Sequence, residues 1–320
     1  MTPFILQILF GITLLVAGGE LLVRGAVTVA KFFKLSTTVI GLTIVAYGTS
    51  SPEMIVSIQA AASGSPDISL GNVIGSNIGN ILAILALVAI VTPLRACPDL
   101  IKRDGWIMVG VSVLLLLLCL DGEVGRLDAL ILLSGAAYYT YRTIQSSKLR
   151  PVLPVPEAQE VPNTEKKACL PCAIAYIAVG LGLLTTGADI LIDGSSGLAR
   201  MFGVSDAVIG LTIVAIGTST PELITSLVAA FRKQADLSIA NIIGSNIFNI
   251  LGIVGVSAAI TPIAVSAQFL SVDLYVMIAT ALIGIWMLYS KHTLSRLEGA
   301  VLLLLYIAYI VYQYAFTTPV

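Results

Sequence analysis

One pattern occurs twice in this chain, and the duplication limits the folds that the chain can adopt. Residues 41–61 (GLTIVAYGTSSPEMIVSIQAA) match residues 210–230 (GLTIVAIGTSTPELITSLVAA) at 15 of 21 positions. Residues 67–82 match residues 236–251 at 11 of 16 positions, with the same offset of 169. Because internal repeats mark repeated structural units, we expect two copies of one fold.

Both copies lie inside long apolar runs. Of the 320 residues 57% are hydrophobic and 11% charged, whereas about a quarter are charged in soluble domains. About 20 apolar residues span a bilayer as a helix, so the runs between charge clusters predict five helices per half. These lie near residues 4–29, 37–63, 69–92, 105–121, 127–147, 171–199, 206–231, 238–262, 271–290 and 297–316.

The positive residues predict how this arrangement sits in the membrane. Loops after the odd-numbered helices hold 14 Lys and Arg, against 2 in the other loops and tails. Positive loops stay in the cytoplasm, so both termini are expected outside a plasma membrane. Residues 1–147 form the first repeat and residues 169–320 the second, joined by a cytoplasmic linker at 148–168. With five helices each, the repeats are inverted, and the predicted fold class is an all-α integral membrane protein with ten transmembrane helices.

Each repeat places a glutamate near the middle of an apolar helix, directly after a proline. Glu53 follows Pro52, and Glu222 is its equivalent. A carboxylate at the bilayer centre costs at least about 2–3 kcal/mol, and no Lys or Arg lies at similar depth in the second, third, seventh or eighth helix. We expect the missing partner to be a transported cation.

The proline is expected to leave neighbouring carbonyls without helical partners. Pro52 lacks an N–H group and clashes with the preceding turn, which frees carbonyls near Ala46, Tyr47 and Gly48. Thr49 and Ser50 add hydroxyls. The second copy repeats these groups with Ala215, Thr218, Ser219, Pro221 and Glu222.

The helices that follow supply further oxygen atoms. They contribute Asn72, Ser76, Asn77 and Asn80 in the first repeat, and Asn241, Ser245, Asn246 and Asn249 in the second. Oxygen-only ligation favours Ca²⁺, Na⁺, K⁺ or Mg²⁺ over zinc or copper. Two carboxylates neutralise one Ca²⁺ or two monovalent ions, which is the equivalence that an antiporter needs.

Simpler interpretations exist for single features of this pattern. A lone proline usually only kinks a membrane helix, and Ser and Asn often hold helices together. Glu20 and its equivalent Asp189 either line an access path or reach toward the membrane surface, and we favour the surface. Cys169 and Cys172 form a C-x-x-C pair, for which reduced thiols near a helix start are favoured over a metal or redox site.

The motif G-T-S-x-P-E, followed by G-S-N-I-x-N, resembles the two α-repeats of the calcium/cation antiporters, above all the short prokaryotic sodium/calcium exchangers. The resemblance implies Na⁺-driven Ca²⁺ transport by alternating access. Carried over by motif position, the Ca²⁺ site comprises Glu53, Glu222, Thr49 and Thr218. Flanking Na⁺ sites use Ala46, Ser50, Ser76, Ala215, Ser219 and Ser245, and Asn80 and Asn249 lie at the centre.

This sequence departs from the family at the last two positions, where members often carry one Asp. Asn at both leaves two formal charges, so the ion stoichiometry stays open and K⁺ co-transport is disfavoured. An H⁺/Ca²⁺ antiporter is the alternative, and a passive cation channel is a remote one. No catalytic constellation lies at membrane depth, so we expect no enzyme and no cofactor. The net charge of −1 gives no basic surface for nucleic acid, and a monomer in the lipid bilayer is expected.

Overall fold

The computed structural model describes residues 1–64, 66–148, 169–203 and 215–316. Six helical stretches in this part are long and apolar enough to cross a membrane, or seven if the interrupted pair Thr37–Thr49 and Ser51–Ala62 is one span. The six are Thr2–Phe33, Ile68–Val91, Leu170–Met201, Ala235–Ile260, Phe269–Lys291 and Arg296–Gln313. The chain is therefore a helical membrane protein. These helices do not establish the ten spans in two inverted repeats that the sequence predicts.

The chain divides into two compact units, and each unit contains residues from both sequence repeats. Unit 1 comprises Met1–Pro52 and Ala137–Asn241, and unit 2 comprises Glu53–Ala136 and Ile242–Val320. The repeat boundaries expected from the sequence mark copies of a pattern, whereas these units mark where the chain packs on itself. The helix α9 (Arg126–Lys148) passes from one unit into the other.

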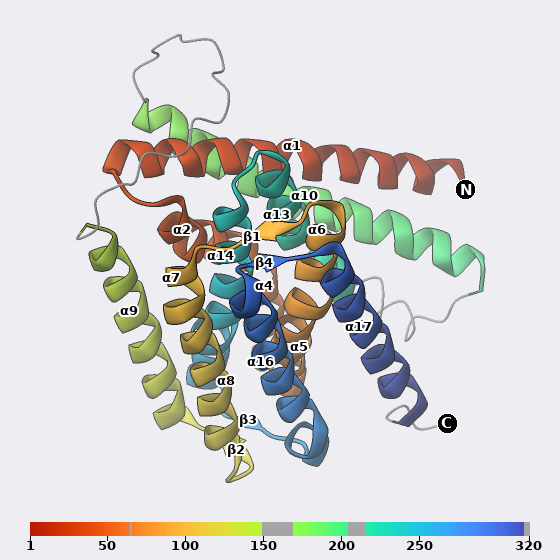
Figure 1. The fold of residues 1–320 in the computed structure, drawn as a ribbon. Coiled ribbons are helices and arrows are strands. Elements are labelled where there is room, and N and C mark those ends of the chain that lie inside the picture. Colours follow the sequence, from red (N-terminus) through yellow and green to blue (C-terminus); the bar gives the residue numbers. More distant parts are fainter. Residues whose placement is uncertain (65, 149–168, 204–214, 317–320) are drawn as a thin grey trace. The chain divides into compact units, whose positions relative to one another are not determined.

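Unit 1 is organised around two long helices, α1 (Thr2–Phe33) and α10 (Leu170–Met201), which lie side by side (Figure 1). A Cβ atom added to Gly18 would lie 2.8 Å from the carbonyl oxygen of Gly180, so only glycine permits this backbone approach. Small residues are what membrane helices use to approach closely. The register runs antiparallel, with Gly11 beside Gly187, Gly18 beside Gly180 and Gly25 beside Ala173.

Shorter helices complete unit 1. They are α2 (Thr37–Ile40), the π-helical turn η1 (Gly41–Val45), α3 (Ala46–Thr49), α12 (Ala215–Thr218) and α13 (Thr220–Phe231). Buried apolar side chains of α1, including Leu15 and Leu22, pack with Leu184 and Ala229 in one core. The first part of the helix predicted at 206–231 lies outside the described residues.

Unit 2 contains most of the remaining helices. They are α4 (Ser51–Ala62), α5 (Pro66–Gly79), η2 (Asn80–Leu85), α6 (Ala86–Val91), α7 (Pro98–Leu100), η3 (Ile101–Gly105), α8 (Trp106–Cys119), η5 (Asn249–Val254), α15 (Gly255–Ile260), η6 (Phe269–Asp273), α16 (Leu274–Lys291) and α17 (Arg296–Phe316). The helix α14 (Ala235–Phe248) enters unit 2 from unit 1. Within unit 2, α16 packs against α8, and α17 packs against α6.

Four strands of two residues each depart from the purely helical prediction. In unit 2, β1 (Leu94–Arg95) pairs with β4 (Thr293–Leu294), and β2 (Glu123–Val124) pairs with β3 (Ile263–Ala264), both antiparallel. These segments follow or precede membrane helices, where the backbone has no helical hydrogen bonds. Pairing satisfies those groups, and it joins a loop of one repeat to a loop of the other.

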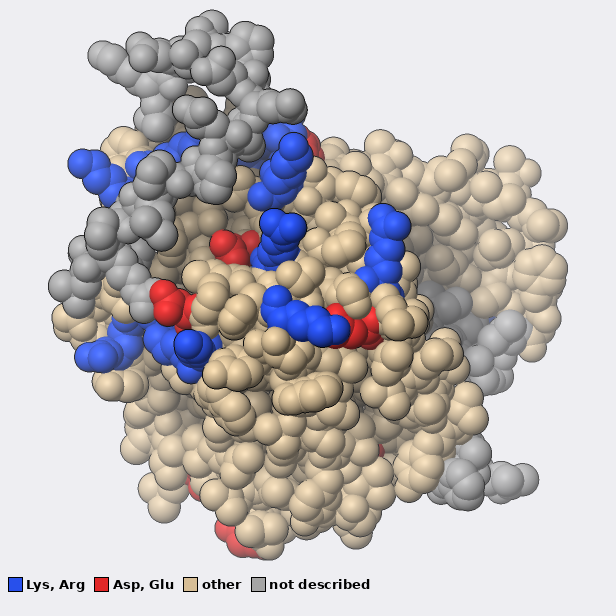
Figure 2. All heavy atoms as spheres, viewed as in Figure 1, with Lys and Arg blue, Asp and Glu red and all other residues tan. Residues whose placement is uncertain are grey.

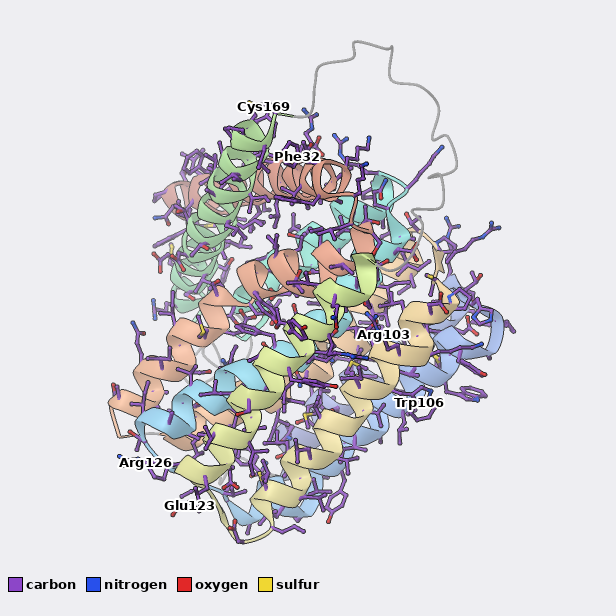
Figure 3. The ribbon with its side chains drawn as sticks, turned by 90° about the vertical axis from the view of Figure 1, so that its left-hand side faces the viewer. Phe32, Arg103, Trp106, Glu123, Arg126 and Cys169 are labelled. Carbon is purple, nitrogen blue, oxygen red and sulfur yellow. A yellow bond between two sulfur atoms is a disulfide. The ribbon has the colours of Figure 1, made fainter. Side chains whose placement is uncertain are left out.

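The two cysteines at the start of α10 correct one expectation from the sequence. Reduced thiols were favoured there, but the structure joins Cys169 and Cys172 in a disulfide, with Cα atoms 5.2 Å apart. The spacing of three residues places both sulfurs on one face of a helical turn. Figure 3 shows Cys169 at the end of α10, near Phe32 at the end of α1.

The surface agrees with a lipid environment. Large apolar side chains such as Leu6, Phe10, Leu304 and Val311 are exposed on α1 and α17. Figure 2 shows that most of the visible face carries no charge. Exposed apolar area of this extent is normal only against lipid or a partner.

Candidate functional site

Both copies of the G-T-S-x-P-E motif interrupt a helix at the serine that lies two residues before the proline. The helix α3 ends at Thr49 and α4 begins at Ser51, while α12 ends at Thr218 and α13 begins at Thr220. Proline removes one backbone donor and crowds the preceding turn. The expected break is therefore present in both copies.

A hydroxyl next to each proline repairs part of that break. The Ser51 hydroxyl donates to the carbonyl oxygen of Tyr47 at 3.0 Å, and the Thr220 hydroxyl donates to that of Ile216 at 2.9 Å. A Ser or Thr side chain reaches the carbonyl four residues earlier in a helix. The Tyr47 carbonyl is therefore occupied by a side-chain hydroxyl, a partner that the proline rule alone does not predict.

The Ala46 carbonyl is also occupied. It accepts from the backbone N–H of Ser50 at 3.0 Å and from the Thr49 hydroxyl at 3.3 Å. The backbone bond persists because Ser50 lies before Pro52, and only the proline itself lacks the donor. A cation at the Ala46 oxygen would have to share it with these donors.

The two motif copies meet within unit 1. The Ser50 hydroxyl of the first copy donates to Oε1 of Glu222 in the second copy at 2.8 Å. The Glu222 side chain is buried, with 1% of its area exposed. Among the described residues, no side chain donates a hydrogen bond to its second oxygen, and no Lys, Arg or His pairs with it. A buried charge of this kind requires compensation.

Hydrogen bonds extend the oxygen-rich region of unit 1 beyond Glu222. The Thr49 hydroxyl shares its one hydrogen between the Ala46 carbonyl and Oδ1 of Asn241, each at 3.3 Å, and the Asn241 amide donates to the Ser226 hydroxyl at 3.1 Å. All three side chains are buried. Thr218 is also buried, while the side chain of Ala215 lies outside the described residues.

Glu53 lies in unit 2 and is 2% exposed. The Asn72 amide donates to the backbone oxygen of Glu53 at 3.2 Å and to the Ser57 hydroxyl at 3.0 Å. Asn72 and Ser57 are the equivalents of Asn241 and Ser226, so both repeats hold the asparagine in the same way. The two glutamates belong to different units, and their common site remains a proposal.

Ser219 lies half-buried in unit 1, and four further predicted residues lie in unit 2. Asn80 and Asn249 each begin a π-helical turn, η2 and η5, and both are buried. Such turns occur often at functional sites. Ser76 and Ser245 precede them by four residues and are also buried.

Four further residues hold these groups and were not predicted from the sequence. Ser51 and Thr220 bond to carbonyls, and Met108 and Met277 contact asparagine amides. Each pair is separated by 169 residues, so the repeat offset was the signal that could have found them.

The chemistry of the site is that of neutral oxygen atoms with few charges. In the part of the chain that the structure describes, no three His, Cys, Asp or Glu side chains form a metal-binding cluster. The buried Glu222 carboxylate accepts from the Ser50 hydroxyl, and the hydrogen-bonded Thr49, Asn241 and Ser226 side chains also lie buried in unit 1. Ca²⁺ and Na⁺ accept such ligands, whereas zinc prefers nitrogen and sulfur.

A helical membrane protein with buried carboxylates among hydroxyl and amide oxygens belongs to the class of cation transporters. The chain belongs to the sodium/calcium exchanger protein family, which matches residues 3–145 and 172–315. The family comprises transporters rather than enzymes.

Individual relatives cover nearly the whole chain. CaxA of Alkalimonas amylolytica, an antiporter by provisional assignment, is 37% identical over 94% of this chain and 96% of its own. The sodium/calcium exchanger MaX1 of Methanosarcina acetivorans is 32% identical over 96% of this chain and 97% of its own. A solved structure of the sodium-calcium exchanger NCX_Mj superposes with a TM-score of 0.83 at 30% identity, covering 96% and 98% of the chains. Together these matches support cation/Ca²⁺ antiport.

Proposed function

We propose that this protein exchanges Na⁺ for Ca²⁺ across the plasma membrane by alternating access. The observation that carries the proposal is the buried carboxylate of Glu222. One of its oxygens accepts from Ser50, and the other has no hydrogen-bond donor among the described residues. A transported cation is the simplest group that compensates this charge.

The proposed site uses both motif copies and the asparagines that follow them. Ca²⁺ is held by Glu53, Glu222, Thr49 and Thr218. Flanking Na⁺ sites use Ala46, Ser50, Ser76, Ala215, Ser219 and Ser245, with Asn80 and Asn249 at the centre. Two carboxylates balance the charge of one Ca²⁺ or of two Na⁺, so the cargoes can replace each other.

Ion flux into vesicles tests the proposal directly. Purified protein is reconstituted into Na⁺-loaded liposomes, which are diluted into Na⁺-free medium containing ⁴⁵Ca²⁺. We expect Na⁺ efflux to drive ⁴⁵Ca²⁺ uptake against its gradient, and Glu222→Gln to abolish it. Glu123→Gln is the matched control, because Glu123 is an exposed carboxylate of β2. Full exchange by Glu222→Gln would contradict the site assignment.

The same liposomes separate the alternatives. An H⁺/Ca²⁺ antiporter is the second candidate, because a buried carboxylate without a basic partner also binds protons. Uptake driven by a pH gradient in the absence of Na⁺ would favour it. Uptake that needs internal K⁺ would indicate a K⁺-dependent exchanger, and purely downhill flux would indicate a channel.

The proposed membrane arrangement is ten helices in two inverted repeats, residues 1–147 and 169–320. Both termini lie outside, and the linker at 148–168 lies in the cytoplasm. The repeated sequence and the asymmetry of Lys and Arg between loops support this arrangement. Single cysteines placed at Thr2 and within 148–168 of a cysteine-free variant test it. An impermeant thiol reagent on intact cells should label only the first.

A further inference from the structure

Four buried asparagines in unit 2 bond to one another across the two repeats. Asn80 donates to Oδ1 of Asn246 at 2.8 Å, and Asn249 donates to Oδ1 of Asn77 at 3.0 Å. The amide of Asn246 donates to the backbone oxygen of Asn77 at 3.2 Å, and the reverse bond is also 3.2 Å. At most 3% of any of these residues is exposed.

The backbone oxygens fix the orientation of every amide in this cluster. A backbone carbonyl can only accept a hydrogen bond, so the Nδ2 atom of Asn246 must face the Asn77 carbonyl. Its Oδ1 then faces Asn80, which must donate. The Oδ1 atom of Asn80 is therefore turned away from Asn246. The same reasoning, with the repeats exchanged, fixes Asn249 through Asn77.

Two methionines support the same orientation. Sδ of Met108 lies 3.5 Å from Nδ2 of Asn246, and Sδ of Met277 lies 3.8 Å from Nδ2 of Asn77. A thioether is a weak acceptor, so it favours the amide nitrogen over the amide oxygen at that position. The amide nitrogens of Asn77 and Asn246 therefore each have two acceptors, which hold the two amides in this orientation.

The amide oxygens that result are buried without partners. Among the described residues, nothing donates a hydrogen bond to Oδ1 of Asn80, to Oδ1 of Asn249 or to the hydroxyl of Ser245. An orphaned buried acceptor is destabilising unless a water or a cation satisfies it. The cluster holds two such oxygens in a fixed direction, as a pre-formed set of neutral ligands requires.

We propose that Asn77 and Asn246 are positioning residues of the transport site, which hold the amide oxygens of Asn80 and Asn249 available to the transported cation. The inference rests on the proposed antiport function. It assigns a task to two residues that need not contact the ion themselves. Without Asn246, the Asn80 amide can rotate and present its NH₂ group, which repels a cation.

Leucine variants test this role, because leucine keeps the branched shape of the asparagine side chain, with bulkier methyl groups, and removes both hydrogen-bonding groups. We expect Asn77→Leu and Asn246→Leu each to raise the KM for Ca²⁺ about tenfold, the cost of one lost ligand orientation, with kcat changed less than twofold. Ca²⁺ binding to the detergent-solubilised protein should weaken by the same factor. Thr280→Val is the matched control and should leave KM unchanged, because Thr280 is buried on α16 but takes part in none of the bonds of the asparagine cluster.

The kinetics of the leucine variants can overturn the proposed role of Asn77 and Asn246. An unchanged KM in both leucine variants, or a loss of kcat with KM constant, would overturn it. If a leucine variant does not fold, Asn77→Ser and Asn246→Ser, which are smaller and remain polar, take its place with the same expectation. Failure of the wild type to exchange Na⁺ for ⁴⁵Ca²⁺, with normal Ca²⁺ affinity, would instead contradict the proposed function.

Discussion

The two sequence copies agree in one region of the molecule and differ in another. In the asparagine cluster of unit 2, every bond made by one copy is repeated by residues 169 positions away. On the long helices of unit 1 the copies differ. Glu20 of α1 accepts from Arg24 at 2.6 Å and from Arg232 at 2.7 Å.

The positions related to these three residues by the repeat offset lack this arrangement. Asp189 and Asp193 of α10 replace Glu20 and Arg24, and Ser63 replaces Arg232. In the chain as far as it is described, no Lys or Arg forms an ion pair with either aspartate. Groups proposed to meet the ion are therefore alike in both copies, whereas the charged groups of α1 and α10 have diverged.

The pairing of Glu20 adds partners that were not predicted from the sequence. For this residue the sequence favours a side chain that reaches toward the membrane surface over one that lines an access path. Its side chain is 29% exposed and pairs with two arginines. The signal was present in the sequence, since Arg24 follows Glu20 by one helical turn, but the second partner comes from α13, 212 residues away.

The largest expected effect tests whether the two copies contribute equally to transport. Glu53→Gln and Glu222→Gln should each lower Na⁺-driven ⁴⁵Ca²⁺ uptake about a hundredfold or more, because loss of even an outer partner of a metal site costs about 10–100-fold. Uptake by the two variants is compared at equal protein in the same liposomes. A tenfold difference between them would show that the copies contribute unequally.

A smaller effect is expected where the two helices of unit 1 touch. Gly18→Ala and Gly180→Ala should each destabilise the protein by about 1–3 kcal/mol, because the new Cβ atoms meet backbone atoms at 2.8 Å and 2.7 Å. Thermal unfolding in detergent measures this. Gly182→Ala is the control, because nothing lies within 4 Å of its Cβ position. Equal melting temperatures for all three variants would contradict the close packing.

A weaker effect is expected from the ion pair between Glu20 of the first copy and Arg232 of the second. Arg232→Gln should destabilise the protein by less than about 1 kcal/mol, because both side chains are partly exposed and Arg24 still pairs with Glu20. The loss should shrink as salt concentration rises. Lys233→Gln removes a neighbouring charge that forms no ion pair with a described residue, and it should have no effect. A salt-independent loss would point to packing by the arginine stem instead.

The smallest effect is expected from the disulfide of α10. Cys169→Ser together with Cys172→Ser should leave exchange and its Na⁺ dependence unchanged, because the bridge joins residues one turn apart and links no second element. Exchange is measured for this variant, and for the wild type with and without dithiothreitol. A loss of exchange on reduction would give the pair a regulatory role.

Much of the architecture could be predicted from the residues alone. Apolar runs and the 169-residue offset indicated a duplicated helical membrane protein, and the family match confirms its class. The proline rule indicated an interrupted helix in each motif copy, and the structure places the breaks at Ser50 and Ser219. The short strands could not be predicted, because β1 and β4 lie about 200 residues apart and pair only once the helices bring them together.

The candidate site, too, could be predicted from the sequence only in part. Residue types and spacing identified Glu222, Ser50, Asn80 and Asn249 as oxygen donors, because the polar groups of a membrane helix stand out from their apolar surroundings. Spacing along one helix could not show that Ser50 donates to Glu222 of the other copy.

The sequence by itself determined the class of protein, the duplication and the kind of atoms that can meet an ion. Only the tertiary structure decided which of those atoms are already occupied and which way each amide faces. The physical reason is that hydrogen-bond direction depends on the partner. The Ala46 oxygen is shared with two donors, while the amide oxygens of Asn80 and Asn249 are left open by residues from the opposite repeat.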